Sequence, residues 1–547
     1  MPMLSLFVSL TLAGPTGLTA TINDPQSHGT LGDPLLSLDE AIRLANGTLT
    51  IAQLSAAEQA QLSGPTGDVR EIVIDASITP TITLQAPLTP IVGPNNHTEH
   101  VEITGIAGAN APVLQGGNHP YVLALRRHLV HVEGLHILGG QVAIDAQMGP
   151  MGPHFHMAKV HECEIEGQSV AGVLVHGFGT EESMLMLEHV HFEGMPVGIR
   201  LDDQTSGTGT AMVECEFVHM HDVQLGNDVL GHGSGQMTML NWFRSDFHGG
   251  DTLARLRRNP TATGDFMFRF VHCEADCHMD VLDAQGNGAG LTMVHHHHSN
   301  FTAAPGHKAF WAYPRTALFD IHGSEMHFDG DVSIAGNTFS PRMWQQNNHY
   351  ANGTVTFDVD GALPNLLWNR YTNCTLVVPS TARSPVTVRS SELFATSVQG
   401  LSLFAPVALR GCYRNGGSLS GQASEQLPAP ARFLGTTDTG PVEMPIGGIA
   451  RLGADLPFGI GGYWVFAFSY PRPVTTAEPV RFYGDPATGI LLPGMVVFQS
   501  NTQVPLPNSP GLVGLEFYVQ SVTVPLLGQS YAPAYHLPRG GLLRFTW

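Results

Sequence analysis

The chain has few charged side chains, and most of those are acidic. Charged residues make up 13% of the 547 residues, with 25 Lys and Arg against 46 Asp and Glu, which gives a formal net charge of −21. This excess of negative charge disfavours nucleic acid as a partner, because the two would repel each other. The apolar content of 43% is too high for a disordered chain, and the 62 Gly and 38 Pro indicate a folded protein rich in turns.

Cysteine is also scarce. Six cysteines in a chain of this length do not build a disulfide framework. Cys163, Cys215 and Cys273 stand at apolar positions of a repeating pattern described below, so we expect all three to be reduced and buried in one inward register. Beyond the first twenty residues no apolar run approaches the length of a membrane span, and the sequence therefore predicts no transmembrane segment.

The first twenty residues have the pattern of an export signal. An apolar run from Leu4 to Leu12 is followed by small and polar residues up to Ala20. This predicts a signal peptide over residues 1–20 with cleavage near Ala20. We therefore expect the protein to be secreted or held at the cell surface.

Residues 21–64 are expected to form an N-terminal cap that contains one short helix. The apolar residues between Ser37 and Asn46 recur at helical spacing, and Ser37 with Glu40 has the spacing of a capping box. A cap is useful at this point because an exposed terminal coil would offer unpaired backbone edges to other chains.

A triplet of apolar, polar and apolar residues returns at nearly constant intervals between residues 135 and 275. Measured on its last residue, the steps are 28, 27, 25, 30 and 28 residues. One such strand in each coil, stacked coil upon coil, predicts a parallel β-solenoid, which we place at residues 65–415. The triplets are Leu135–Ile137, Cys163–Ile165, Val190–Phe192, Cys215–Phe217, Ser245–Phe247 and Cys273–Ala275.

The sequence changes character after the repeat. Residues 416–446 are rich in Gly, Ser and Pro, which is typical of a linker. From 447 to 547, aromatic and β-branched runs such as Tyr463–Tyr470, Met495–Gln499 and Leu515–Val524 alternate with Pro and Gly turns. We expect a small β-sandwich here, and an all-β protein as a whole.

The middle residues of the triplets are predicted to point outward, where adjacent coils place equivalent residues about 4.8 Å apart. The resulting column contains His136, Glu164, His191, Glu216, Asp246 and Glu274. Parallel columns, two residues earlier and two residues later, add further carboxylates and imidazoles and one guanidinium. Imidazoles and carboxylates are thus expected to alternate up one face.

Such a face suits the cleavage of a sugar chain, which needs paired carboxylates, or a cation bound by carboxylates together with a base. The central members are the candidate catalytic residues, namely Arg244, Asp246, His191 and Glu216. The surrounding members are the candidate substrate-binding residues, namely Glu164, His189, Glu193, Glu214, His248, His272 and Glu274.

Other interpretations of these residues stay open. Glu beside His relieves the repulsion of a pure Glu column, so the face is also what a structural ladder would show. Oxygen ligands in adjacent coils suit calcium, and the candidate ligands are Glu162, Glu164, Glu214 and Glu216. A transition metal is an equally open alternative at His272-Cys-Glu-Ala-Asp-Cys-His278, where thiol and imidazole ligands lie close together, or at the run His295–His298. No cofactor is required. Trp242 and Phe243 are predicted to fill the core of their coil rather than to stack on a sugar.

Three segments resemble known families. The repeat is similar to that of the right-handed parallel β-helix superfamily of pectate lyases and polygalacturonases. Asp202-Asp203, Gly231-His232-Gly233 and Arg255-Leu-Arg257 follow the order of polygalacturonase motifs, without the upstream Asn-x-Asp. The segment Leu36–Asn46 resembles the capping helix of exported bacterial β-helix proteins, and Pro507–Gln520 resembles a C-terminal module of secreted planctomycete-type proteins. The resemblance implies a right-handed coil that acts on polysaccharide.

Two functional hypotheses follow. In the first, the protein binds an extracellular polysaccharide along the acidic and histidine-rich face and cleaves it, as a lyase or a glycoside hydrolase. In the second, it is a non-catalytic structural or adhesive protein of the cell surface or matrix, because a β-helix by itself does not decide function.

Overall fold

The computed structural model describes residues 17–426 apart from short interruptions, the longest at 93–99 and 149–155, and beyond them the strands between Arg432 and Thr546. The chain divides into two compact units. Unit 1 consists of Met1–His295 and Ser299–Phe319, and unit 2 of His296–His298 and Asp320–Trp547. Nearly all regular structure in the described part is β, which confirms the predicted fold class of an all-β parallel solenoid.

Unit 1 begins with a strand and a short helix. The strand β1 (Leu18–Ile22) pairs in parallel with β3 (Val69–Asp75) and antiparallel with β2 (Leu62–Ser63). Between β1 and β2 lie α1 (Leu38–Ala45), the 3₁₀ turn η1 (Ile51–Gln53) and α2 (Ala56–Gln59).

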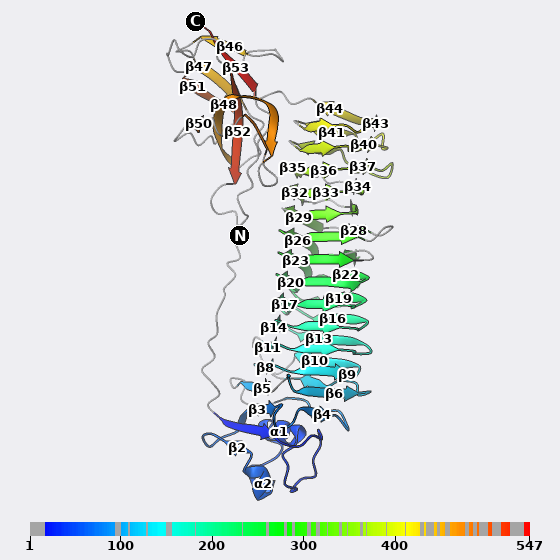
Figure 1. Ribbon diagram of the computed structural model, residues 1–547. Helices are drawn as coiled ribbons and strands as arrows, with labels where there is room; N and C mark the ends of the chain where they lie inside the picture. Colours follow the sequence, from blue (N-terminus) through cyan, green and yellow to red (C-terminus); the bar gives the residue numbers. More distant parts are fainter. Residues whose placement is uncertain are drawn as a thin grey trace. The chain divides into compact units, whose positions relative to one another are not determined.

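The helix α1 is the one that the sequence predicts. The hydroxyl of Ser37 accepts from the backbone N–H of Glu40, and the carboxylate of Glu40 accepts from the N–H of Ser37 at 3.0 Å, which are the two bonds of a capping box. The helix packs against β1 and β3, next to the first strands of the solenoid (Figure 1). Its role as a cap stays a prediction.

Three sheets of parallel strands form the body of unit 1, and their strands stack in chain order (Figure 1). Sheet A contains β3, β5 (Val101–Ile106), β8 (Val130–Glu133), β11 (His156–His161), β14 (Glu182–Glu188), β17 (Thr210–Glu216), β20 (Met237–Phe243), β23 (Asp265–Val271) and β26 (Leu291–His297). Sheet B contains β4 (Thr81–Thr83), β6 (Val113–Gly117), β9 (His136–Gly139), β12 (Glu164–Glu166), β15 (His191–Glu193), β18 (His219–His221), β21 (Asp246–Gly250), β24 (Glu274–Cys277) and β27 (Asn300–Ala303).

Sheet C completes each coil. It contains β7 (Leu123–Leu125), β10 (Val142–Met148), β13 (Ala171–Gly179), β16 (Val197–Thr205), β19 (Leu225–Gly231), β22 (Thr252–Arg258) and β25 (Leu282–Gly286), and β28 (Lys308–Ala312) follows β27. Because side chains alternate between the two sides of a strand, every second residue of each strand enters the interior of the coil.

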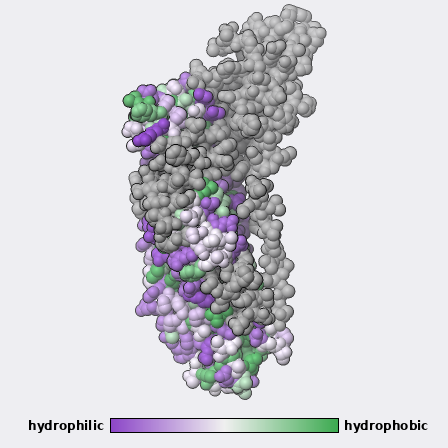
Figure 2. Space-filling view, turned by 180° about the vertical axis from the view of Figure 1, so that it is seen from behind, coloured by the Kyte–Doolittle hydropathy of each residue, from purple (hydrophilic) through white to green (hydrophobic). Residues whose placement is uncertain are grey.

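The core of unit 1 is made of these inward columns. The inward column of sheet B is at most 1% exposed and runs through Ile137, Ile165, Phe192, Met220, Phe247 and Ala275. Along the described surface seen from behind, most of the area is hydrophilic, with scattered hydrophobic patches (Figure 2). The apolar side chains are thus concentrated inside the coil, as the alternating triplets predict.

The three cysteines of the repeat are buried free thiols, as expected. Burial raises the pKa of Cys163 and of Cys273 to about 12. These two share the column just before sheet B, whereas Cys215 lies on β17 in sheet A and pairs with Leu187 and Trp242. The prediction of one register for all three was therefore wrong for Cys215.

The first part of unit 2 also consists of parallel coils. Its first set of strands is β29 (Leu318–Ser324), β32 (Arg342–Gln346), β35 (Asn365–Leu367), β38 (Val386–Arg389), β41 (Val407–Arg410) and β44 (Ala423–Gln426). The second set is β30 (His327–Asp329), β33 (His349–Ala351), β36 (Arg370–Thr372), β39 (Glu392–Phe394) and β42 (Tyr413–Asn415). The third set is β31 (Asp331–Asn337), β34 (Thr354–Asp360), β37 (Thr375–Val378), β40 (Ser397–Gly400) and β43 (Leu419–Gly421).

A series of buried side chains links the coils of unit 2 through hydrogen bonds to the backbone. The side-chain oxygen of Asn348 accepts from the N–H of Met326 at 3.0 Å, and Asn369 does the same for the N–H of Asn348 at 2.9 Å. In the next coil Ser391 accepts from the N–H of Asn369 at 3.0 Å. These bonds satisfy backbone N–H groups at corners where the sheet ladders are interrupted.

The C-terminal strands are mostly antiparallel. One sheet contains β45 (Arg432–Phe433), β47 (Ile449–Gly453) and β51 (Asn501–Pro505). The other contains β46 (Val442–Pro445), β53 (Gly541–Thr546), β52 (Glu516–Pro525), β48 (Ile460–Thr475) and β49 (Arg481–Gly484), with β50 (Ile490–Leu491) beside β48. Two sheets are what a sandwich requires, and the face-to-face packing of a sandwich stays a prediction.

Several boundaries differ from those expected. Parallel pairing continues through β43 and β44 to Gln426, so the solenoid enters the range 416–446 that the sequence assigns to a linker. The strands β48 and β52 cover Tyr463–Tyr470 and most of Leu515–Val524, while Met495–Gln499 lies outside the described residues. Ala20 is fully buried within β1, so cleavage near Ala20 would divide that strand. Among the described residues, no helix has the length and apolarity needed to cross a membrane.

Candidate functional site

A corner in the left-handed backbone conformation precedes most strands of sheet B in unit 1. The N–H of four of these corner residues donates to a carbonyl of the next coil, as Glu162 does to Glu188 and Arg244 to Val271, both at 3.0 Å. This conformation costs a residue with a Cβ about 1–2 kcal/mol, so the inter-coil bonds hold it in place. The corner residues have φ between 48° and 55° and are Glu162, His189, Phe217, Arg244 and His272.

Two outward columns follow on sheet B itself. Glu164 lies opposite both His136 and His191, and the same register continues along the sheet. The first column contains His136, Glu164, His191, His219, Asp246 and Glu274. The second contains Leu138, Glu166, Glu193, His221, His248 and Asp276. Imidazoles and carboxylates therefore do share one face, as predicted.

The predicted column was wrong in its fourth coil. Glu216 is the last residue of β17 in sheet A, where it lies opposite Glu188 and Phe243. His219 takes its place on sheet B, because the inward residue of this coil is Met220 rather than Phe217. Counted on the residues that pair in sheet B, the steps become 28, 27, 28, 27 and 28 (137, 165, 192, 220, 247 and 275). The irregular steps of 25 and 30 in the sequence pattern were the signal of this slip of three residues.

Imidazole and carboxylate groups are paired along the face. Nε2 of His136 lies 3.1 Å from the carboxylate of Glu166, and Nε2 of His191 lies 3.6 Å from that of Glu193. Further along, Asp246 has an imidazole on each side. Nδ1 of His219 is within hydrogen-bond distance of one carboxylate oxygen of Asp246, and Nε2 of His248 lies 3.9 Å from the other.

Asp246 is the most enclosed member of its group. Its side chain is 28% exposed, against 49% for that of His219 and 39% for that of His248. A carboxylate that accepts from Nδ1–H of an imidazole fixes the tautomer in which Nε2 is free to take a proton. The pair of Asp246 and His219 is therefore suited to general-base chemistry on a bound molecule.

Arg244, a predicted catalytic residue, contacts the other sheet. Its guanidinium lies 3.5 Å from the carboxylate of Glu216 and 5.5 Å from the ring centre of Phe217. The ring of His189 stacks on the same ring of Phe217, with the two ring centres 4.7 Å apart. Arg244, His189 and Phe217 form an exposed stack along the corner, and His272 occupies the next corner.

The four glutamates proposed for calcium do not lie together. Glu162 is at a corner and Glu164 on β12, while Glu214 and Glu216 are on β17 in sheet A. Burial raises the pKa of Glu214, the charge of Glu216 raises it further, and Arg269 opposes the change. Within the described part of the chain, a group whose ligand atoms lie within 4.8 Å of one another includes Glu164, together with His136 and Glu166, but none includes the other three glutamates.

The residues that resemble polygalacturonase motifs lie on three neighbouring strands of sheet C. Asp202 faces outward and lies 3.6 Å from Nδ1 of His176, but Asp203 faces inward and accepts from the N–H of Thr205 at 2.9 Å. The two carboxylates are therefore on opposite sides of β16 and do not form a pair. His232 and Gly233 lie outside the described residues.

Asp228 on β19 is a buried carboxylate that contacts two arginines of sheet C. Its side chain is 2% exposed and accepts two bonds from Nη2 of Arg257, at 2.6 and 2.7 Å, while Nε of Arg200 lies 3.4 Å away.

Replacing Asp228 by Ala is expected to lower the free energy of unfolding by about 1–3 kcal/mol, because the bonds to charged donors are lost. Urea denaturation measures this loss. The exposed Glu182→Ala is the control, and an equal effect of both substitutions would contradict a structural role for Asp228.

Sequence reasoning missed a second group of imidazoles and carboxylates, on the outer face of sheet A. It comprises His100, Glu102, His131, Glu133 and His161. The signal was present, since Val130-His-Val-Glu133 alternates like the triplets and Glu102, His131 and Lys159 occupy equivalent positions in adjacent coils.

Comparisons with protein-family models, with curated proteins and with solved structures each find no match. A function for the protein therefore has to follow from the arrangement of the residues themselves.

Proposed function

We propose that the protein binds an extended extracellular polysaccharide along the outer face of sheet B in unit 1 and cleaves it near Asp246. The supporting observation is a pair of polar columns, one running from β9 to β24 and the other from β12 to β24, whose members recur every coil, about 4.8 Å apart. A polymer with its own repeat can contact such a surface at many equivalent points.

The group that acts on the chain is the His219 and Asp246 pair. In this proposal Nε2 of His219 removes a proton, either from a sugar carbon next to a carboxyl group or from a water molecule. In the first case the electron pair of the C–H bond forms a double bond as the bond to the leaving oxygen breaks; in the second the water oxygen replaces the leaving oxygen on the sugar carbon. In both cases the leaving oxygen takes up a proton from solvent, and the protonated imidazole of His219 then returns its proton to solvent. Asp246 holds the imidazole in position and stabilises its protonated form, as a carboxylate does in other acid–base dyads.

The test is incubation of the purified protein with a panel of acidic and neutral polysaccharides, with and without chelator, followed by mass spectrometry of the products. Shortened chains with unsaturated ends indicate elimination, and saturated ends indicate hydrolysis. His219→Gln and Asp246→Asn are each expected to lower turnover about 100-fold or more, the usual contribution of a positioned base.

The matched control is Glu182→Gln on β14 of sheet A, which removes the same charge from an exposed site away from this face. It should keep turnover within twofold of the natural protein. Circular dichroism checks that every variant is folded. Unchanged turnover in both sheet B variants would remove His219 and Asp246 from the reaction.

One observation favours a second function. Since the carboxylates of Glu166, Glu193 and Asp246 each have an imidazole partner, the face also satisfies itself as a ladder that stabilises the sheet. A rigid, non-catalytic protein of the cell surface or matrix needs no more than this. If no polysaccharide of the panel is shortened, this second function is the one to pursue.

A further inference from the structure

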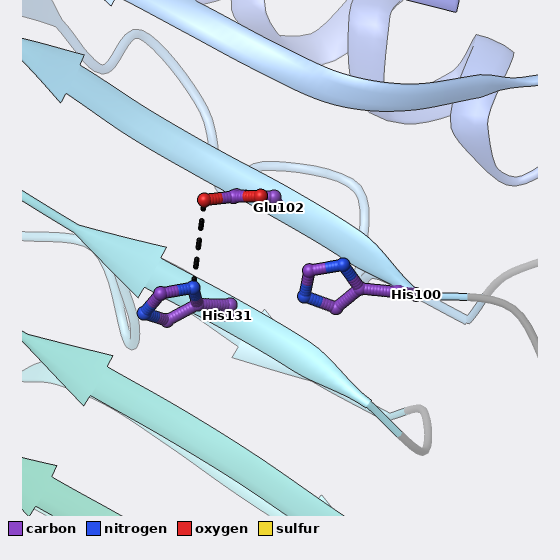
Figure 3. A group of neighbouring side chains, drawn as sticks. All are labelled: His100, Glu102 and His131. Atoms are coloured by element: carbon purple, nitrogen blue, oxygen red, sulfur yellow. Dashed lines mark ion pairs between the residues drawn. The ribbon is translucent and has the colours of Figure 1, made fainter. Parts of the chain in front are cut away.

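The missed cluster on sheet A places two imidazoles and a carboxylate around one point. Glu102 on β5 lies directly opposite His131 on β8, and His100 stands two residues before Glu102 on the same side of the chain. Nδ1 of His131 lies 3.5 Å from the carboxylate of Glu102, and one ligand atom from each of the three residues lies within 4.8 Å of the others (Figure 3).

The cluster is sheltered. The side chains of Glu102 and His131 are 18% and 15% exposed.

The second ring nitrogen of His131 also has a suitable neighbour. Its Nε2 lies 3.7 Å from the carboxylate of Glu133, which in turn lies 3.4 Å from Nδ1 of His161. In metal sites a ligating imidazole commonly donates its other N–H to a carboxylate, which fixes the ring orientation and strengthens the ligand. At 3.7 Å the two groups form an ion pair rather than a hydrogen bond, and a small movement of the Glu133 carboxylate toward His131 would let it accept this N–H.

The charge on the neighbouring strand adds a reason for a cation. Glu71 on β3 lies directly opposite Glu102, and two like charges opposite each other destabilise a sheet. The carboxylate of Glu71 accepts a bond from the hydroxyl of Thr19 at 2.7 Å, but this neutral donor does not cancel its charge. A cation bound by Glu102 would reduce the repulsion.

We propose that His100, Glu102 and His131 bind a divalent transition-metal ion of the zinc type, with Glu133 orienting His131. Two imidazole nitrogens and one carboxylate are a ligand set that zinc uses at sites with an open fourth position, whereas calcium prefers oxygen ligands alone. The site lies on sheet A and is independent of the polysaccharide function proposed for sheet B.

Titration calorimetry of the full chain with zinc chloride alone, after removal of metals by chelator, tests the proposal. One saturable site is expected. Glu102→Gln and His131→Gln should each weaken binding about 100-fold or more. Glu133→Gln should weaken it about 10-fold, as the loss of an orienting partner does in other metal sites. Calcium chloride in place of zinc chloride should give no saturable heat.

The chain offers a matched control in His136 and Glu166 on sheet B, another pair with an imidazole 3.1 Å from a carboxylate. His136→Gln should leave the zinc affinity within twofold. The visible spectrum of bound Co²⁺ reports nitrogen and oxygen ligands on the natural protein without any substitution. This measurement therefore does not depend on whether a variant folds. Absence of saturable zinc binding, a Co²⁺ spectrum like that of the free ion, or equal affinities in the sheet A variants and the natural protein would overturn the proposal.

Discussion

Replacing Trp242 by Ala is expected to lower the free energy of unfolding by about 3–5 kcal/mol, the range observed for truncating a large aromatic side chain in a core. Trp242 is fully buried on β20, and its ring lies 6.3 Å from that of Phe270. Its indole N–H donates to the side-chain oxygen of Asn227 at 3.2 Å, so the substitution also leaves a buried acceptor without this donor. Urea denaturation followed by circular dichroism measures the loss.

The control is the next residue in the chain. Phe243 faces outward from β20, where the guanidinium of Arg269 lies 5.2 Å from the centre of its ring, so the prediction that it fills the core was wrong. Phe243→Ala is expected to cost only about 1 kcal/mol. Equal losses from the two substitutions would mean that the strand does not alternate in the register described.

Lowering the pH from 7 to 4 is expected to cost about 3 kcal/mol of stability through His295 alone. Burial, assisted by the charge of Arg269, lowers the pKa of His295 from 6.5 to about 4. Between these two values the unfolded chain binds a proton at this residue and the folded chain does not. The contribution of His295 to the free energy of unfolding is therefore fully present above pH 6.5 and is lost progressively as the pH falls to 4. The gap between the two pKa values corresponds to about 3 kcal/mol.

Denaturation of the natural protein and of His295→Gln over this pH range measures the effect. The variant should lack about 3 kcal/mol of the acid-induced decline, because every other group is the same in the two proteins and cancels in the difference. Identical curves for His295→Gln and the natural protein would show that His295 does not resist protonation in the fold.

Much of the fold was predictable because its physical causes are local. The capping box of Ser37 and Glu40 is contained within four residues, and the helix begins where these residues predict. The solenoid followed from a repeat of 27 or 28 residues in its best-ordered part, since a repeating inward column needs a repeating apolar residue. Where the repeat was ambiguous, the prediction slipped by three residues.

This shift of three residues in the predicted strand changed which residues belong to the candidate site. Cys215-Glu-Phe217 and Val218-His-Met220 are both consistent with a strand that alternates inward and outward, and only the hydrogen bonds to neighbouring coils select the second for sheet B. The choice exchanged Glu216 for His219 and so brought an imidazole, rather than a second carboxylate, beside Asp246.

The sequence by itself determined the fold class, the short helix and the presence of imidazoles and carboxylates on an outward face, because each depends on the spacing of residues close in the chain. Only the tertiary structure decided which coil contributes which residue, that Asp203 rather than Asp202 points into the coil, and that Glu102 and His131 meet on sheet A. These features depend on register between strands 25 to 30 residues apart in the chain. Register is fixed by inter-strand hydrogen bonds and by the packing of inward side chains, neither of which a local pattern contains.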